Sequence, residues 1–275
     1  MLLITALGTL GACANPTERA LSYAQTRGMT ASVIQGARFR HQVLSARSAP
    51  KPAAGPAAAL LYVFIEGDGS PWIDAGSKVA RDPTPRRPLA LELAAATIHP
   101  VLYLGRPCYF GVRLDANCTP AVWTSGRYST AVVDSMVAAV DRYAADNNDP
   151  ALVLIGYSGG GTLAVLMASH LPRTRAVITI AANLDVEAWT RWHRYLPLSE
   201  SENPAAAPPL ADSIRQWHLV GGKDHNVPEA LDRRYFDAIR PDQVWRYADF
   251  DHACCWAEKW GSISARIDSA MASSR

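Results

Sequence analysis

Residues 156 to 160 are the first place in this 275-residue sequence where side chains of suitable type and spacing could do chemistry. Their sequence, Gly-Tyr-Ser-Gly-Gly, fits the pattern G-x-S-x-G, which holds a serine hydroxyl above a sharp turn between a strand and a helix. An apolar strand-like stretch, Leu152 to Ile155, precedes the motif, and an apolar helical stretch follows it. Because glycines permit the sharp turn, this context favours a nucleophilic role for Ser158 over an ordinary glycine-rich turn.

A serine hydroxyl is a weak nucleophile at neutral pH, so Ser158 needs a base, and the base needs an orienting carboxylate. We predict Asp224 as the carboxylate because it ends a strand-like segment that enters a glycine-rich turn. We predict His252 as the base because, among the seven histidines, it alone lies between the last predicted strand and the last helix. Two alternatives stay open: Asp224 as the cap of the following helix, and His225 as the base although it precedes the final strand.

The negative oxygen that develops during acyl transfer needs hydrogen-bond donors, usually two backbone N–H groups. Gly159, the residue after the serine, provides the first predicted N–H group. The second is predicted at Asp68 or Gly67, in a Glu-Gly-Asp-Gly turn directly after an apolar strand. Glu66 occupies the position where histidine is common in the corresponding motif of esterases and lipases. A plain turn without a catalytic role is the alternative for this segment.

Short apolar runs that alternate with helical segments must position these side chains. Six runs are predicted as strands, namely residues 59–66, 100–104, 151–156, 176–181, 216–220 and 243–247. Near-continuous apolar runs indicate burial on both faces, as in a parallel sheet, and Phe39 to Leu44 predicts an earlier strand by its alternation. Apolar residues at helical spacing lie between them, in 133–140 and 163–166. The pattern predicts an α/β fold, a doubly wound, mostly parallel sheet with helices on both faces.

The Gly-Asp-Gly turn, the serine motif, Asp224 and His252 occur in the order found in the α/β-hydrolase superfamily, and residues 59 to 270 resemble that family. The resemblance implies the α/β-hydrolase fold and hydrolysis of an ester, thioester or amide through an acyl-serine, with no metal and no organic cofactor. A carboxylic ester of a small molecule or a lipid is the predicted substrate. Because this fold hosts many chemistries, the resemblance does not fix the substrate.

The same resemblance predicts which residues surround the substrate. Four fall near strand ends that face the active site in this architecture: Tyr157, Trp72, Trp123 and Arg106. The insertion at residues 183 to 214, after the sixth strand, is predicted as a small lid, with a purely structural cap as the alternative. Its aromatic side chains are Trp189, Trp192, His193 and Tyr195.

Composition and the N-terminus narrow the class of protein. About half of the residues (49%) are apolar and the formal net charge is only +2, which predicts one buried core and no nucleic-acid partner.

Residues 1 to 13 are mostly apolar and end in Leu-Gly-Ala-Cys, which resembles the lipobox of bacterial lipoproteins, so Cys13 is the predicted lipidation site. This implies a cell-envelope protein at the periplasmic face of the outer membrane, attached by its N-terminal lipid alone. A disordered N-terminus, or a start assigned at the wrong position, is the alternative, and cleavage stays open because no Lys or Arg precedes the apolar run.

The predicted organisation is a signal peptide over residues 1–13, a tether with the first strand or strands over 14–58, and an α/β-hydrolase domain over 59–275.

Cys108 and Cys118 bracket a short loop without helical period and are predicted to form a disulfide. Whether the neighbours Cys254 and Cys255 pair stays open, because adjacent cysteines join only through a strained peptide. No metal site is predicted, because no set of cysteines and histidines supplies four ligands.

Three other functions remain alternatives. A binding or assembly lipoprotein would keep the fold without turnover, but it is expected to lose Ser158, Asp224 or His252, and all three are present. A serine peptidase or amidase would use the same side chains. Thiol chemistry at Cys254 and Cys255 would give a redox-gated hydrolase or a disulfide exchanger, and a vicinal disulfide that fixes the loop of His252 is a related interpretation.

Overall fold

The computed structural model describes residues 15–46, 59–112 and 115–273 of the chain. The predicted signal peptide and Cys13 lie outside these residues, so the lipid anchor and the envelope location stay predictions. Within the described ranges, no helix is long and apolar enough to cross a membrane.

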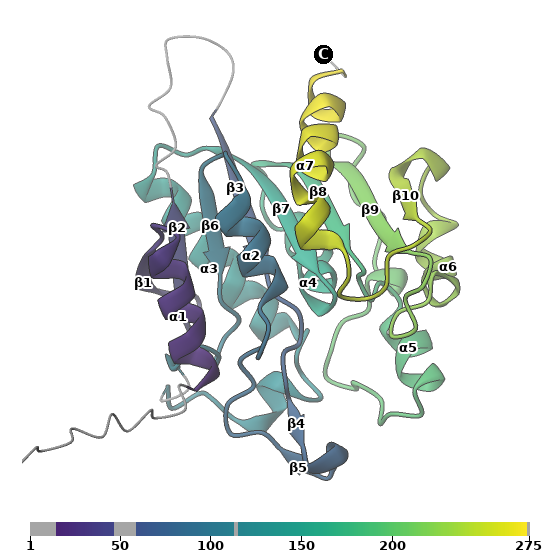
Figure 1. Ribbon diagram of the computed structural model, residues 1–275. Helices are drawn as coiled ribbons and strands as arrows, with labels where there is room; N and C mark the ends of the chain where they lie inside the picture. The colour runs from purple at the N-terminus through teal and green to yellow at the C-terminus, as the bar shows by residue number, and fades with distance from the viewer. Residues whose placement is uncertain (1–14, 47–58, 113–114, 274–275) are drawn as a thin grey trace, which may run out of the picture.

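An eight-stranded sheet forms the centre of the molecule, in the order β1-β2-β6-β3-β7-β8-β9-β10 (Figure 1). Its strands are β1 (Thr30–Gln35), β2 (Arg40–Ala46), β3 (Leu60–Ile65), β6 (Val101–Leu104), β7 (Ala151–Tyr157), β8 (Thr174–Ile180), β9 (Arg215–Gly221) and β10 (Val244–Tyr247). Neighbouring strands in the series β6-β3-β7-β8-β9-β10 pair in parallel. Strand β2 pairs antiparallel with both of its neighbours, β1 and β6. A separate pair, β4 (Trp72–Ile73) and β5 (Lys78–Val79), lies beyond the carboxyl end of β3.

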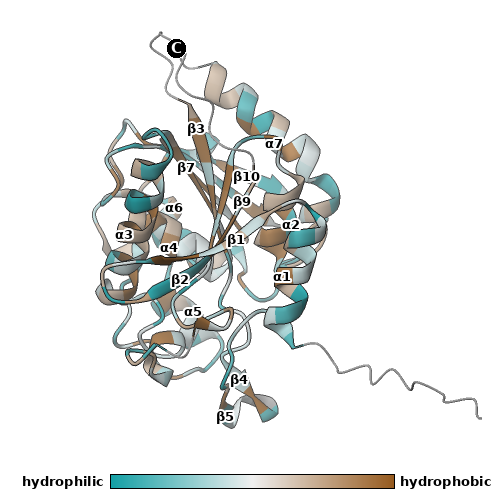
Figure 2. Cartoon of the chain, turned by 90° about the vertical axis from the view of Figure 1, so that its left-hand side faces the viewer, coloured by the Kyte–Doolittle hydropathy of each residue, from teal (hydrophilic) through white to brown (hydrophobic). Residues whose placement is uncertain are grey.

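Helices cover both faces of this sheet, as Figure 2 shows. On one face lie α1 (Pro16–Thr26), α2 (Leu89–Ala96) and α7 (Trp256–Ala272), and on the other lie α3 (Thr130–Asp146), α4 (Gly159–Ala168) and α6 (Arg233–Phe236). Further helical segments lying wholly within the described residues are α5 (Val186–Trp192) and the 3₁₀ turns η1 (Asp74–Gly76), η3 (Pro120–Trp123), η4 (Pro204–Ala206), η5 (Glu229–Asp232) and η6 (Pro241–Gln243). The central strands β3, β6, β7 and β8 are buried along nearly their whole length, which explains their continuous apolar sequences.

All seven strands predicted from the sequence are present, with ends displaced by one or two residues. The two helical patterns correspond to α3 and α4. The insertion at 183–214 follows β8, the sixth strand of the main sheet, and contains α5 and η4. The doubly wound α/β architecture predicted from the alternating pattern is therefore confirmed.

The segment predicted as a tether is mostly folded. Residues 15 to 46 form helix α1 and the β1–β2 hairpin, which extends the main sheet. A capping box begins α1: the Asn15 side chain accepts from the Glu18 N–H, and the Glu18 carboxylate accepts from the Asn15 N–H. Ala20 and Ala24 on the inner side of α1 are buried. The folded domain thus begins well before residue 59, because α1 buries Ala20 and Ala24 and strand β2 buries Val43 and Leu44.

Candidate active site

Ser158 sits at the sharp turn between β7 and α4, at the carboxyl edge of the sheet. Its backbone has φ of 51° and ψ of −126°, a conformation that non-glycine residues adopt rarely and at an energetic cost. Gly160 makes the turn possible, because a Cβ at this position would collide with the backbone oxygens of Ile65 and Glu66 at the end of β3. The strand-turn-helix predicted around the serine is present, and the strained serine backbone is the form that this motif requires.

Three side chains from distant parts of the chain meet above this turn. His252 Nε2 lies 3.1 Å from Ser158 Oγ, and His252 Nδ1 lies 2.8 Å from Asp224 Oδ2. The Asp224 side chain is almost fully buried (1% exposed), whereas His252 is 22% exposed. With the carboxylate on Nδ1, the proton of a neutral imidazole is held there, and Nε2 is left as an acceptor for the serine proton. The structure therefore brings together the three residues predicted as nucleophile, base and acid. The hydrogen bonds to Ser158 and Asp224 are made by His252, whereas His225, the rival base, is exposed.

The turn after β9 fixes the carboxylate of Asp224. Its Oδ1 accepts from the backbone N–H groups of Asn226 and Val227, each at 2.8 Å, which leaves Oδ2 for the imidazole. The side-chain amide of Asn226 also lies 3.0 Å from His252 Nε2. Sequence reasoning missed Asn226, because an asparagine two residues after a turn aspartate carries no motif of its own.

Two backbone N–H groups are candidates for stabilising a negative oxygen. Gly159 begins α4, where the first N–H groups of a helix have no partner within the helix. The N–H of Asp68 forms no hydrogen bond with a described residue. Gly67 is excluded as the second donor in this conformation, because its N–H donates to the Glu66 carboxylate at 3.1 Å. Of the two residues predicted for this role, Asp68 is the better candidate.

The Glu66 carboxylate holds the turn after β3 in place through hydrogen bonds. It accepts from the N–H groups of Ala90 and Leu91 at the start of α2 and from the Tyr103 hydroxyl. Burial raises the pKa of the Glu66 carboxyl to about 7, although the hydrogen bonds from Gly67 and the start of α2 act in the opposite direction. The residue that replaces the expected histidine thus ties the turn to a helix N-terminus, where a carboxylate is favoured.

The side chain of Asp68 is the centre of an ion cluster beside the nucleophile. Its carboxylate accepts from Arg106 at 2.5 Å, from Arg127 at 2.8 Å and from the Tyr128 hydroxyl at 2.7 Å. Burial alone would raise the pKa of Asp68, but the guanidinium groups of Arg127 and Arg106 hold it well below its usual range. A Cβ on Gly159 would collide with this carboxylate and with the Tyr128 hydroxyl, so the glycine after the nucleophile lets the cluster approach. The cluster fixes the backbone of residue 68.

A pocket of about 1200 Å³ opens over Ser158 and His252. Tyr157 and Trp72 line it, as predicted. The prediction was wrong for Trp123 and Arg106, which do not reach the pocket. Trp123 is buried, and its indole N–H donates to the Ala80 carbonyl. The side chain of Arg106 is 1% exposed, because its guanidinium is drawn inward to the carboxylate of Asp68.

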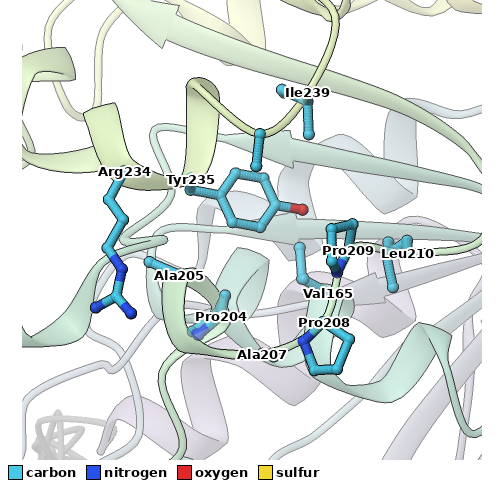
Figure 3. A pocket seen from close by; sticks show the side chains of 11 residues that line it. Val165, Pro204, Ala205, Ala207, Pro208, Pro209, Leu210, Arg234, Tyr235 and Ile239 are labelled. Atoms are coloured by element: carbon cyan, nitrogen blue, oxygen red, sulfur yellow. The ribbon is translucent and has the colours of Figure 1, made fainter.

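The 183–214 segment forms one wall of the same pocket. Trp189 and Tyr195 line it, and the ring centroids of these two residues lie 5.3 Å apart. Trp192 is 60% exposed and does not line the pocket, so only part of the predicted aromatic lid faces the site. A second pocket lies elsewhere, between η4 and α6, with Pro204 and Tyr235 in its wall (Figure 3). Its volume of about 30 Å³ is room for about one water molecule, which excludes a substrate of ordinary size.

Two disulfides are present among the described residues. Cys108 is joined to Cys118, as the loop predicted, with Cα atoms 5.6 Å apart. Cys254 is joined to Cys255, two residues after His252. The turn that carries His252 is also held by the carboxylate of Asp251, which accepts from the Cys254 N–H. Redox gating at this turn stays a prediction. Among the described residues, no group of three or more His, Cys, Asp and Glu side chains is placed to hold a metal ion.

Buried Asp232 gives the protein a testable pH dependence. Its Oδ1 accepts from the N–H groups of Leu184 and Asp185, and burial raises its pKa from 3.8 to about 8. Between about pH 4 and 8 the unfolded chain has lost this proton and the folded chain keeps it, so the free energy of unfolding falls as pH rises through that range. Asp232→Asn keeps the acceptor and has no proton to lose. We expect urea denaturation to show that wild type loses stability relative to Asp232→Asn between pH 5 and about 8.

The comparison of the two proteins is its own control, because other titrating groups, including Glu66, are common to both and cancel in the difference. A difference in unfolding free energy that stays constant from pH 5 to about 8 would contradict the raised pKa of Asp232.

Comparison with known proteins agrees with this architecture. An α/β serine hydrolase without a lid from Xanthomonas campestris matches with a TM-score of 0.55 and 14% identity, over 88% of this chain and 94% of that protein. An esterase from Pyrococcus furiosus matches with a TM-score of 0.57 and 11% identity, over 89% and 91%. A bacterial membrane phospholipase A matches with a TM-score of 0.52 and 15% identity, over 92% of each chain.

The chain therefore has the α/β-hydrolase fold. No family model and no curated protein matches it by sequence. At identities of 10–16%, the likeness concerns the fold, and the chemistry has to be argued from the site itself.

Proposed function

We propose that the protein is a serine hydrolase that cleaves carboxylic esters through an acyl-serine intermediate. The observation that carries the proposal is the hydrogen-bonded series Asp224, His252, Ser158, with its two distances of 2.8 and 3.1 Å, at the floor of a large pocket. A serine on a strained turn, an imidazole whose Nε2 lies within hydrogen-bond distance of that serine and a buried carboxylate on Nδ1 are the three parts that nucleophilic acyl transfer needs.

In the proposed first half-reaction, Ser158 Oγ attacks the carbonyl carbon of the ester and His252 Nε2 accepts the hydroxyl proton. The carboxylate of Asp224 stabilises the resulting imidazolium. The N–H groups of Gly159 and Asp68 donate to the carbonyl oxygen as it becomes negative. His252 then gives its proton to the alcohol oxygen as the bond to the carbonyl carbon breaks, and the acyl group remains on Ser158.

In the second half-reaction a water molecule takes the place of the alcohol. His252 accepts a proton from this water as the oxygen attacks the acyl carbon, and Ser158 leaves with that proton when the acyl bond breaks. The products are a carboxylic acid, an alcohol and the regenerated enzyme. In both half-reactions His252 is the group of the chain that accepts the proton and then returns it.

Three further observations support an ester as the substrate. The pocket is open enough for an acyl or alcohol group of considerable size. Its wall combines aromatic side chains with polar ones, as small-molecule sites do. One structure with the same fold is described as a serine hydrolase, one as an esterase and one as a phospholipase A. We further propose that the substrate is a small-molecule or lipid ester and that the N-terminus carries the lipid predicted at Cys13.

The experiment is hydrolysis of p-nitrophenyl esters of short and long acyl chains by wild type and Ser158→Ala. We expect wild type to release p-nitrophenol and the variant to lose at least about 10⁴-fold in kcat, because removal of the nucleophile leaves only binding and the oxyanion donors. Circular dichroism and thermal unfolding of both proteins control for folding. Turnover that persists in Ser158→Ala would overturn the role of the serine. No turnover of any ester by folded wild type would instead favour a binding protein or an amidase.

A further inference from the structure

Three arginine side chains at the pocket have no role in the proposed hydrolytic steps. Arg86 and Arg87 lie in the loop before α2, Arg194 follows α5, and all three line the pocket above Ser158. All three are exposed. None of them forms an ion pair with another described residue.

Exposed arginines without an ion pair to a described residue occur elsewhere on the molecule as well, for example Arg142 and Arg175. Arg173, Arg240 and Arg246, at other places on the molecule, each form an ion pair with a carboxylate at 3.2 Å or less. The pocket differs from the rest of the surface in that three arginines without an ion pair in the described part of the chain line the same opening.

The carboxylates of the pocket do not balance these charges. Glu66 is buried and turned toward the N–H groups at the start of α2, and Asp68 is neutralised by Arg106 and Arg127. Among the described residues of the lining, Glu200 is the remaining carboxylate, and its Oε1 accepts from the Ser125 hydroxyl. Three guanidinium groups without an ion pair to a described residue thus share the lining with one carboxylate that also has none, so the mouth of the pocket carries a net positive charge.

Arg194 is unusual in its backbone as well. It directly follows the C-cap of α5 with φ of 55°, the left-handed position that glycine most often fills. Its N–H donates to the Arg191 carbonyl, and the next N–H donates to the Thr190 carbonyl, which closes the helix end. A side chain at this position strains the backbone, and the Arg194 guanidinium forms no hydrogen bond with the described carbonyl groups of the helix end. Ligand binding would explain why an arginine is present.

Large apolar side chains accompany the arginines. Trp72, Tyr195 and Leu196 line the pocket and are 41%, 56% and 82% exposed. Aromatic and aliphatic groups left open to solvent next to unpaired cations suit a ligand that has an apolar part and an anionic part. Guanidinium groups bind carboxylate and phosphate in the same bidentate manner, so the geometry specifies an oxyanion without specifying which one.

From these contacts we infer that the natural substrate is an ester with an apolar body and a negatively charged carboxylate or phosphate group, held at the pocket mouth by Arg86, Arg87 and Arg194. This inference rests on the proposed function and specifies the class of its substrate. The ester carbonyl lies at Ser158, and the anionic end of the molecule reaches the arginines.

Matched esters test the inference. Three p-nitrophenyl esters of equal acyl length carry a terminal carboxylate, a terminal phosphate or a terminal methyl ester, and kcat/KM is measured for each. We expect wild type to prefer at least one charged ester over the neutral one by about tenfold, and about 0.5 M salt to reduce that preference because salt screens exposed charges. The triple variant Arg86→Gln, Arg87→Gln, Arg194→Gln should lose the preference. The charged ester with the higher kcat/KM identifies the oxyanion that the arginines bind.

Two variants separate binding from structure. Arg175→Gln removes an exposed arginine at the opposite, amino-terminal end of β8 and should change neither the preference nor the activity. Arg194→Gly relieves the backbone strain, so it should keep or raise the temperature of unfolding while lowering the preference for the charged ester. Equal kcat/KM for charged and neutral esters in wild type, or a preference that survives in the triple variant, would overturn the inference.

A failure of the proposed function gives a different result. If wild type turns over none of the three esters, hydrolysis itself is wrong, and calorimetric binding of the same esters to Ser158→Ala then decides on the anion site alone. Tighter binding of a charged ester that is lost on changing the three arginines supports the site. Equal binding of charged and neutral esters excludes it.

Discussion

Asp224→Asn should lower kcat for ester hydrolysis by about 10⁴-fold while leaving the fold intact. The asparagine oxygen can still accept from the N–H groups that Asp224 Oδ1 binds now, so the turn after β9 persists. The NH₂ group of the asparagine would face His252 Nδ1, so Nδ1 would have to accept a hydrogen bond from it. The proton of the neutral imidazole moves to Nε2, and the base can no longer take the proton of Ser158.

Steady-state kinetics on a p-nitrophenyl ester measure this loss, and urea denaturation checks that the variant is folded. Asp249→Asn is the matched control, because Asp249 is exposed in the segment between β10 and His252 and pairs only with Lys223 on the surface. The control should keep kcat. A kcat for Asp224→Asn within tenfold of wild type would show that another group orients His252.

Asp68→Asn should lower both the free energy of unfolding and kcat. The substitution removes the carboxylate between Arg106 and Arg127, whose side chains are 1% and 6% exposed, and leaves two buried like charges side by side. Breaking a buried ion pair by removal of one partner costs about 3–5 kcal/mol. Because the same side chain holds the N–H of residue 68 near Ser158, kcat should fall by about 10²-fold, as for the loss of one oxyanion donor.

Urea denaturation and kinetics on the same preparations test both parts of this prediction. Asp242→Asn breaks an exposed ion pair with Arg240 and should have little effect on either quantity. The double variant Asp68→Asn, Arg106→Met should be less destabilised than the sum of its single variants, because removal of the second charge relieves the repulsion. A stability of Asp68→Asn equal to that of wild type would contradict the account of the cluster.

The parts of the fold that the sequence predicts are those with a local signal. Continuous apolar runs mark strands that are buried on both faces, and the glycines around Ser158 mark a turn that a Cβ would block. The order of Ser158, Asp224 and His252 along the chain places each at the carboxyl end of a strand or just beyond it, and parallel strands bring those ends to one edge of the sheet. These features need no knowledge of contacts between distant residues.

Other parts depend on contacts that sequence patterns do not contain. Arg106 and Trp123 were predicted to face the substrate, because they follow strand ends, but a buried carboxylate and the Ala80 carbonyl draw them inward. Arg127 and Tyr128 complete the cluster at Asp68, and neither carries a motif. Helix α1 is a different case, because the capping box in the spacing Asn-x-x-Glu at residues 15 to 18 was available in the sequence as a signal.

The most direct test of an activated serine is mass spectrometry after treatment with a fluorophosphonate, which bonds covalently to serines that have a working base. We predict one adduct per wild-type chain, on the peptide that contains Ser158. We predict no adduct on Ser158→Ala, and slow labelling of Asp224→Asn, in which the base is in the wrong tautomer. An adduct at another residue, or no adduct on folded wild type, would contradict the assignment of Ser158 as the nucleophile.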